Sequence, residues 1–527
     1  MTMDAVPRRA TTVTLEVVAL LAASTLLAGF VAARYDGLWG ETDSNVFATA
    51  IRAMLVDAHL VPASNVYVNG YGFPALGAFL VRATGLSVAH LQLFGGALLV
   101  VWLVIPAWLA YRELTGSGRG ATLATVFILA QPDFLFPVLR GTHEKFTRGL
   151  MFLCLYLFVR SVAARLHWRR FAALLLAFYL AIYALVTFNN LLATSFIVAV
   201  GLALVGSLGV RWLGGTQSDE SAAARRRMLY VIGVSLLLAF LFTFYTYPPA
   251  RHGLLVVESM WNRLAMLFLE VQDVATNPYQ AVETAWTSSS AYLLLSIPNW
   301  LLLGVSFVLW VVVTLVWWRN RSWPQVPGTL VLWSLYGAFG LLGALSVLVD
   351  ISGAVAGNLQ LRSFSTFAMV AAALVADRFV HWTPHRPWVL RWAYGALAVV
   401  VAFLSIVAVI KATNEPALSN KWIYYAPGEL VALDWSRRSY QDATTWAGLD
   451  ERLRAAIGIC CAWEMEGARF DSSDLDVGTR NALISDIIRA RSARLGVDLP
   501  IPGDSLRVYD NGDAEIYHLR PRTPFQR

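Results

Sequence analysis

The sequence predicts a polytopic α-helical membrane protein with a small α+β domain at its C-terminal end. Of its residues, 57% are hydrophobic and only 14% are charged, and the mean hydropathy is +0.57. This composition is typical of a chain whose main solvent is the lipid bilayer. Long apolar runs recur up to residue 410, and beyond that point the composition becomes polar and mixed in charge.

The apolar runs predict about eleven transmembrane helices, each long enough to cross the roughly 30 Å hydrocarbon core. Arg8 and Arg9 precede the first run, which exceeds the hydrophobic region of a signal peptide and lacks a small-x-small cleavage site after it. We therefore expect a retained first span and a cytoplasmic N-terminus. The predicted spans cover residues 13–33, 90–111, 121–138, 149–164, 171–188, 191–210, 228–246, 291–317, 328–349, 363–379 and 389–410.

The arginines between the runs predict the topology. Short cytoplasmic loops hold an excess of Lys and Arg, and alternate connections of this chain follow that rule, whereas the opposite loops at Asn189-Asn190 and residues 350–360 contain no basic residue. An odd number of spans then places the C-terminus outside. These scattered clusters account for the net charge of +7, so the charge does not indicate nucleic-acid binding. The arginines on the predicted cytoplasmic side are Arg112, Arg119, Arg165, Arg169, Arg170, Arg211, Arg225, Arg226, Arg227, Arg319, Arg321, Arg378, Arg386 and Arg391.

Two long connections lie on the predicted outer side, at residues 34–89 and 247–290. In the first, apolar residues spaced three or four apart between charges predict helices along the membrane surface. We divide the chain into a membrane domain, residues 1–410, and an outward-facing soluble domain, residues 411–527, which is of a size that folds by itself.

The soluble domain is predicted to be of the α+β type. Residues 429–437, 450–458 and 475–495 have helical patterns, and two short alternating segments around Asn511-Gly512 predict a β-hairpin. The spacing of the cysteines predicts neither a disulfide framework nor a metal site. The three cysteines are Cys154, Cys460 and Cys461.

Glu41 and Asp43 stand just after the first span, where the chain leaves hydrocarbon for water. One interpretation is that Asp43 or Ser44 caps the surface helix that follows. The other is that a partly desolvated carboxylate beside a second acid has a raised pKa and acts as a general base toward a hydroxyl group. Both interpretations can hold for the same residue, and the sequence leaves them open.

A second charged cluster lies between the third and fourth spans, from Arg140 to Arg148. Long charged side chains in such a place often only anchor a helix at the interface. His143 and Glu144 are too short for that role and stand beside three cations. The cluster suits a phosphate with an attached sugar, because Arg140, Lys145 and Arg148 would offset its charge and His143 would donate a hydrogen bond or bind a metal.

Arg362 begins a span from the predicted outer side, where positive-inside statistics disfavour it. A phosphate at the outer interface would explain it, and so would an ion pair with Asp350 or Glu41. Arg251 and His252 follow a Pro-Pro turn in the second long connection and are less specific candidates for substrate contact.

Together these features resemble the GT-C superfamily of integral-membrane glycosyltransferases, which use polyprenyl-phosphate-linked sugars as donors. The matching features are the acidic motif, an aromatic-Gly-Phe-Pro element that begins at Tyr71, the charged second outer loop, a long later outer loop and an arginine at a late outer boundary. The likeness covers the chain to about residue 410. Thr42 separates Glu41 from Asp43, whereas several branches have adjacent acids, so the identity of the base stays open.

The resemblance implies an inverting transfer to a hydroxyl of an extracytoplasmic glycan, lipid or protein by a multi-pass protein of the cell membrane. Asp43, or alternatively Glu41, would be the catalytic base. The implied ligands of the donor phosphate are Arg362, Arg140, Lys145 and His143. The implied substrate-binding residues are Glu144, Arg148, Tyr71, Arg251 and His252.

Some GT-C branches need a divalent metal ion. Glu41, Asp43, His143 and Glu144 carry suitable oxygen and nitrogen atoms, but their spacing defines no site. We therefore predict that the chain needs no metal and no other cofactor.

Two other functions are compatible with many spans. A transporter or lipid flippase would have charged residues at mid-span depth and broken helices in paired halves, whereas this chain keeps most charges at the span ends and shows no internal repeat. A plain membrane anchor for the soluble domain would not need so many spans.

Overall fold

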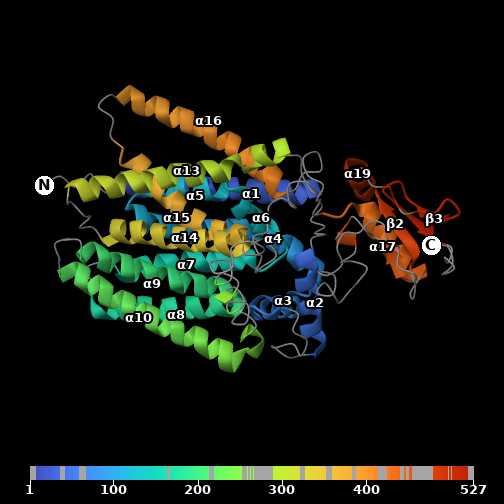
Figure 1. The fold of residues 1–527 in the computed structure, drawn as a ribbon, viewed down its shortest axis with the longest axis horizontal. Helices are drawn as coiled ribbons and strands as arrows, with labels where there is room; N and C mark the ends of the chain where they lie inside the picture. The colour runs from blue at the N-terminus through green and yellow to red at the C-terminus, as the bar shows by residue number, and fades with distance from the viewer. Residues whose placement is uncertain are drawn as a thin grey trace.

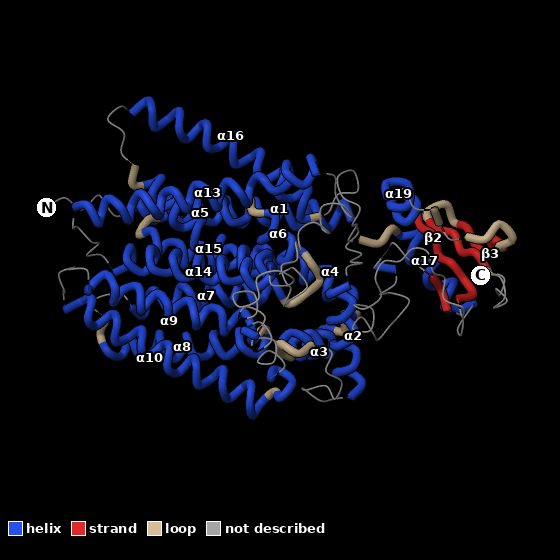
Figure 2. Tube along the Cα trace, in the orientation of Figure 1, coloured by secondary structure: helices blue, strands red, loops and turns tan. Residues whose placement is uncertain are grey.

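Long helices packed side by side form most of the molecule, and a small domain with a β-sheet extends from one end of the bundle, in the computed structural model (Figures 1 and 2). The N-terminus lies at the opposite end (Figure 1). The structure describes residues 7–35, 42–57, 67–162, 166–212, 219–251, 258, 261–262, 265, 289–320, 327–351, 359–382, 387–413, 424–439, 444–446, 450, 452–453, 479–495, 498–499 and 501–519.

The helices of the bundle follow the predicted apolar runs closely. They are α1 (Pro7–Tyr35), α4 (Val88–Thr115), α5 (Gly118–Leu129), α6 (Pro132–Leu139), α7 (Glu144–Val162), α8 (Trp168–Phe188), α9 (Asn190–Trp212), α10 (Asp219–Leu241), α13 (Ser289–Asn320), α14 (Pro327–Ile351), α15 (Leu359–Val380) and α16 (Pro387–Ala412). A π-helix, η1 (Phe242–Thr246), and a 3-10 helix, η2 (Pro248–Arg251), continue α10.

The polytopic helical class is confirmed, whereas the number of eleven spans stays a prediction. Among the described residues, eight helices are long and apolar enough to cross a membrane, or nine if the bent pair α5 and α6 counts as one span. The remaining two predicted runs, 90–111 and 149–164, lie within α4 and α7. Of the eight, α15 is the most interior, since 67% of the residues in its apolar window are buried.

The prediction of one continuous span over residues 121–138 is wrong. The helix breaks between α5 and α6, whose axes are bent by 75°. Pro132, at the first position of α6, has no amide hydrogen to continue a helix. A proline also disfavours the α conformation for the residue before it, and Gln131 is accordingly extended, with φ −93° and ψ 116°.

Two short helices, α2 (Thr42–Asp57) and α3 (Gly72–Thr84), confirm the helices expected in the first outer connection. In Figure 1, α2 runs across the direction of the bundle helices, at the end nearest the C-terminal domain. The two helices pack together through Phe47, Ile51 and Phe73. A Cβ atom at Gly77 would lie 2.6 Å from Ile51 Cδ1, so this close packing requires glycine.

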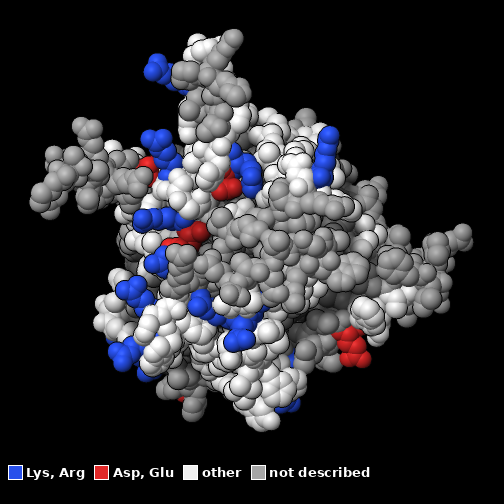
Figure 3. Space-filling view, turned by 90° about the vertical axis from the view of Figure 1, so that its left-hand side faces the viewer, with Lys and Arg blue, Asp and Glu red and all other residues white. Residues whose placement is uncertain are grey.

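Basic side chains gather at the end of the bundle where α1 begins. Figure 3 shows Lys and Arg over that face with few acidic side chains among them. Several helices carry an arginine in their last turn, including α4 with Arg112, α7 with Arg160 and α13 with Arg319. This arrangement agrees with the positive-inside prediction, and the orientation of the termini in the membrane stays a prediction.

The C-terminal domain contains a four-stranded sheet in the order β1-β2-β4-β3. Its strands are β1 (Thr444–Trp446), β2 (Thr479–Ser485), β3 (Leu506–Asp510) and β4 (Ala514–His518), and its helices are α17 (Pro427–Ser439) and α19 (Asp486–Leu495). The pairing of β1 with β2 is parallel, and the other two pairings are antiparallel. The predicted hairpin is confirmed, with Gly512 at φ 90° in its turn, and the predicted helix over residues 429–437 lies in α17.

The prediction of a single helix over residues 475–495 is wrong. Residues 479–485 form β2, and α19 begins only at Asp486. Ala482, Leu483 and Ile484 have no exposed surface, which is typical of a central strand and does not distinguish it by pattern from a short buried helix. The domain has a hydrophobic core separate from that of the bundle. The boundary at residue 410 stays a prediction, and most of the predicted helix 450–458 lies outside the described residues.

Candidate active site

Asp43 and Arg140 form an ion pair between the two predicted outer loops. Asp43 lies in the first turn of α2, and Arg140 directly follows α6. Arg140 Nη1 is 2.8 Å from Asp43 Oδ2, and the two side chains are 13% and 54% exposed, respectively. The guanidinium of Arg140 also lies 4.7 Å from the ring centroid of Phe136. A carboxylate that is open to solvent is therefore paired with a cation held against an apolar ring.

A glutamine from α4 holds the two segments together. Gln92 is 8% exposed, and its Nε2 donates hydrogen bonds to the carbonyl oxygens of Ser44, at 2.9 Å, and Gly141, at 3.0 Å. A Cβ atom at Gly141 would lie 3.1 Å from Ser44 Oγ, which is closer than an ordinary contact. The backbone beside Asp43 is thus tied through the Gln92 side chain to the backbone beside Arg140.

The pKa of Asp43 lies below its ordinary value, so the raised pKa expected from the sequence is wrong. Desolvation by the surrounding elements raises this pKa, but the charges of Arg140 and Arg362 lower it by more. The expectation considered only the neighbouring acid, whereas both arginines come from distant segments. Asp43 also lies within the first turn of α2, where the helix dipole favours a negative charge.

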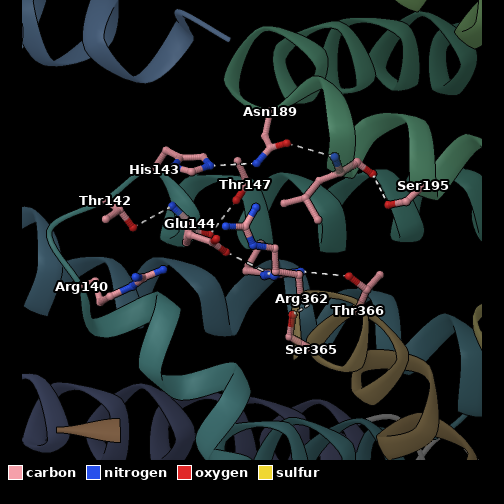
Figure 4. Close-up of polar contacts among 12 residues, drawn as sticks. Arg140, Thr142, His143, Glu144, Thr147, Asn189, Ser195, Arg362, Ser365 and Thr366 are labelled. Carbon is pink, nitrogen blue, oxygen red and sulfur yellow. Dashed lines mark hydrogen bonds and ion pairs between the residues drawn. The ribbon is translucent and has the colours of Figure 1, made fainter. Parts of the chain in front are cut away.

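His143 is buried beside the ion pair in a neutral form. Its ring is 4% exposed, and desolvation lowers its pKa from 6.5 to about 4. Asn189 Nδ2 donates to His143 Nε2 at 2.9 Å (Figure 4), and the Tyr67 hydroxyl lies 3.1 Å from the same atom. Because Leu192 N donates to Asn189 Oδ1, the amide orientation is fixed and the ring proton is on Nδ1. His143 therefore adds no positive charge to the site.

Glu144 and Arg148 connect α7 to α15. Arg148 Nη2 is 3.2 Å from Glu144 Oε2, and its Nη1 donates to Thr366 Oγ1 at 3.1 Å; Figure 4 shows Glu144 and Thr366 on either side of this connection. Arg148 is 1% exposed. These contacts give both residues a structural connection between helices, and their contact with substrate stays a prediction.

Lys145 is buried without a counter-charge. Its side chain is only 2% exposed, and no residue in the described part of the chain accepts a hydrogen bond from it or pairs with it. Lysine is almost never fully buried unless it is paired, and burying an uncompensated charge is costly. Burial accordingly lowers the pKa of Lys145 to about 7, and its contact with a donor phosphate stays a prediction.

Arg362 lies in the first turn of α15, exposed at the same end of the bundle. Figure 4 shows it beside the cluster of Glu144 and Thr366, and its charge contributes to the low pKa of Asp43. The alternative pairing with Asp350 does not occur. Asp350 instead accepts hydrogen bonds from the backbone amides of Leu359, at 3.1 Å, and Gln360, at 2.8 Å, at the start of α15.

Of the four other predicted residues, two lie apart from the ion pair and two lie outside the described residues. Tyr71 packs in an aromatic group, with ring centroids 6.0 Å from Phe242 and 5.4 Å from Tyr247. Arg251 donates to the carbonyl oxygen of Phe244 at 2.7 Å. Glu41 and His252 are outside the described residues, so their roles, like those of Tyr71 and Arg251, stay predictions.

Comparison with known proteins supports the architecture but not a close relationship. No family model and no curated protein matches the sequence. Solved structures of the Archaeoglobus fulgidus oligosaccharyltransferase are similar in fold. The apo form has a TM-score of 0.57 at 11% identity and covers 89% of this chain and 69% of that one. The form tethered to an acceptor peptide with an NVT sequon has a TM-score of 0.56 at 12% identity, covering 96% and 74%.

A third structure of that oligosaccharyltransferase holds an inhibitory peptide and a dolichol-phosphate, and it has a TM-score of 0.53 at 12% identity, covering 97% of this chain and 75% of that one. The chain has the GT-C fold. Identity this low establishes the architecture alone. The chemistry of this chain therefore has to be argued from its own residues.

The described residues of this chain do not form a metal site. No three His, Cys, Asp or Glu side chains among them converge as metal ligands. Asp43 is held by Arg140, and His143 Nε2 is occupied by two hydrogen-bonding partners. Because Glu41 is outside the described part of the chain, metal independence stays a prediction.

The sequence did not identify the uncharged residues that hold the site. Gln92, Asn189 and Thr366 each lie in or beside an apolar run, where a single polar residue is not distinctive. The Asn189-Asn190 pair interrupts the apolar pattern between α8 and α9, and that interruption was the available signal. Tyr67 was visible only as one of several aromatic residues in its loop.

Proposed function

We propose that this chain is an inverting glycosyltransferase that moves a sugar from a polyprenyl-phosphate-linked donor to a hydroxyl group of an extracytoplasmic acceptor. The observation that carries the proposal is the ion pair of Asp43 with Arg140, together with the charge of Arg362 that acts on the same carboxylate. The three residues come from three distant segments of the chain. A base beside two cations is what transfer from a phosphate leaving group requires.

Asp43 is proposed as the general base. It takes the proton from the acceptor hydroxyl while the hydroxyl oxygen bonds to the anomeric carbon. The bond from that carbon to the phosphate oxygen breaks on the opposite face, and the polyprenyl phosphate leaves with the bonding electrons. The low pKa keeps the carboxylate ionised and ready to accept a proton at neutral pH, although a base with a low pKa is a weak one.

Donor binding would strengthen the base. The donor phosphate competes with Asp43 for the guanidinium of Arg140, which is only 2.8 Å from the carboxylate in the free protein. When Arg140 turns to the phosphate, the Coulomb interaction that lowers the pKa of Asp43 weakens. Asp43 then becomes a better proton acceptor only after the donor has arrived.

Arg140, Arg362 and the buried Lys145 are proposed to stabilise the leaving phosphate, and His143 to contribute a neutral polar wall. Guanidinium groups suit this role because they bind phosphate oxygens with paired hydrogen bonds. The lipid tail of the donor would stay among the spans while its headgroup reaches the outer end of α15. Dolichol-phosphate, which is bound in one structure of the archaeal oligosaccharyltransferase, belongs to the lipid class proposed here.

The test is transfer by the purified, membrane-reconstituted protein from a panel of polyprenyl-phosphate sugars. Asp43→Asn should lower the rate by about 10²- to 10⁴-fold, the usual contribution of a general base. Asp57→Asn is the matched control, because Asp57 is exposed at the opposite end of the same helix, and it should act like the wild type.

Two results would contradict the proposal. An Asp43→Asn variant as active as Asp57→Asn would remove Asp43 from its role. A product with the same anomeric configuration as the donor, measured by NMR, would exclude a single inverting displacement.

A further inference from the structure

Two consecutive tyrosines join the C-terminal domain to the helices on either side of the acidic motif. The ring of Tyr424 stacks on Tyr35, the last residue of α1, with centroids 3.9 Å apart and an interplanar angle of 10°. The hydroxyl of Tyr425 accepts a hydrogen bond from Asn45 Nδ2 at 3.2 Å. Asn45 follows Asp43 by two positions on α2. The segment that carries the proposed base is therefore bracketed by these two contacts.

The two tyrosines belong to different hydrophobic cores. Tyr424 has no exposed surface and packs in the core of the bundle together with Tyr35. Tyr425 is 7% exposed and packs in the core of the C-terminal domain with Leu433 and Ile516. Adjacent side chains thus anchor one piece of backbone in both parts of the molecule.

Arg452 fixes the backbone and the side chain of this tyrosine pair. Its guanidinium donates to the carbonyl oxygen of Tyr424, and its own carbonyl oxygen accepts from the Tyr425 hydroxyl at 2.9 Å. Arg452 is held in turn by Glu429, at 2.9 Å, and Asp450, at 2.5 Å. All three charged residues are 1% exposed.

A buried cluster of this kind is poor evidence for stability, because the cost of desolvating three charges offsets their attraction. Its best-attested use is to impose one geometry on the groups around it. Here the groups around the cluster are Tyr424 and Tyr425, which in turn contact Tyr35 and Asn45. The cluster therefore fixes where the C-terminal domain holds the start of α2.

We propose that Tyr424, Tyr425, Glu429, Asp450 and Arg452, which we call the tyrosine latch, position α2 and with it Asp43 for the reaction. The inference rests on the proposed function in one respect, the role of Asp43 as base. Gln92 holds the backbone of Ser44 from the bundle side, and the latch holds Asn45 from the opposite side. Tyr425 is thus a positioning residue that acts through Asn45.

Tyr425→Phe tests the latch, because it removes the hydroxyl and keeps the ring. Of the two hydrogen bonds that the Tyr425 hydroxyl makes, only the one from Asn45 reaches α2, and loss of one neutral hydrogen bond of ordinary strength corresponds to about a fivefold increase in local opening. Amide hydrogen exchange in residues 43–49 of the full-length protein should therefore become about fivefold faster. If the latch positions the base, Tyr425→Phe should lower kcat and leave the donor KM nearly unchanged. Arg140 directly follows α6 and Arg362 lies in the first turn of α15, and the latch holds neither of these helices.

Tyr517→Phe is the matched control. The Tyr517 hydroxyl donates to Glu515 within the same domain, at 2.5 Å, and this variant should alter neither exchange in α2 nor kcat. Adding Asn45→Ala to Tyr425→Phe should produce no further acceleration, because both changes remove the same hydrogen bond. Arg452 itself is a poorer test, since its loss would leave Glu429 and Asp450 buried without a counter-charge.

Exchange in α2 that stays at the wild-type rate in Tyr425→Phe would overturn the latch, as would faster exchange confined to the C-terminal domain. The exchange measurement does not depend on transfer activity. A wild-type protein that transfers no sugar, combined with a loosened α2 in Tyr425→Phe, would support the latch as a mechanical link and refute the assigned role of Asp43.

Discussion

Gly70→Ala should disturb the site from a loop that contains no charged residue. Gly70 is buried between Tyr67 and α3, and an added Cβ would lie 2.2 Å from the carbonyl oxygen of Thr187 and 3.0 Å from that of Phe188. Both obstacles are backbone atoms at the end of α8, so no side chain can rotate away. The loop would have to move by roughly 1 Å to restore an ordinary contact.

The cost of that movement follows from the hydrogen bonds that the loop makes. Asn190 N donates to the Asn69 carbonyl oxygen at 2.8 Å, and the Tyr247 hydroxyl donates to the Tyr67 carbonyl oxygen at 2.6 Å. Lengthening each by 1 Å would break it. Two hydrogen bonds at about 1 kcal/mol each, added to about 1 to 3 kcal/mol for overpacking, give about 3 to 5 kcal/mol.

The assay is the half-life of thermal inactivation in detergent, together with the transfer rate. Gly70→Ala should shorten the half-life and lower kcat, because Tyr67 moves with the loop and its hydroxyl contacts His143 beside Asp43. Gly201→Ala is the control, since no atom lies within 4 Å of its added Cβ and alanine is the better helix former. If the two variants behaved alike, the reasoning about this loop would be refuted.

Two further predictions concern charge. Lowering the pH from 7 to 5 should remove about 2 kcal/mol of stability through His143, because the unfolded imidazole binds a proton below pH 6.5 and the folded one only below about pH 4. The His143→Gln variant should lose less stability over the same pH range. Parallel stability profiles for the two proteins would contradict this. Arg362→Ala should raise the donor KM about tenfold or more, which corresponds to the loss of a charge-assisted hydrogen bond. Arg378→Ala, at the other end of α15, should leave the donor KM unchanged. An unchanged donor KM in Arg362→Ala would exclude phosphate contact.

The elements that were predicted correctly have a local cause. Apolar runs give the bundle helices because their length and composition are set by the bilayer. The Asn511-Gly512 pair gives the β3 to β4 hairpin because its turn requires the positive φ that Gly512 adopts. The pattern placed Asp43 and Arg140 at the predicted outer ends of spans, but it did not predict their ion pair.

The failures share a nonlocal cause. The pKa of Asp43 falls because Arg140 and Arg362 approach it through the fold, and no spacing in the sequence reports that distance. Arg148 and Lys145 look alike in the sequence, yet one joins Glu144 to Thr366 and the other has no partner among the described residues. Packing, which the sequence pattern does not report, decides whether a buried cationic side chain pairs within the protein.

The break between α5 and α6 explains how Arg140 reaches Asp43. Had α5 continued straight, Arg140 would lie roughly 16 Å beyond Leu129, the last residue of α5, along the axis of that helix, at 1.5 Å per residue. The 75° bend instead turns α6 across the bundle, where it packs against α4, α7 and α16. Arg140 then emerges beside Gly141, which Gln92 of α4 ties to Ser44. Because Pro132 interrupts the span, Arg140 comes to lie beside the proposed base. A residue without a polar side chain therefore helps to form the site.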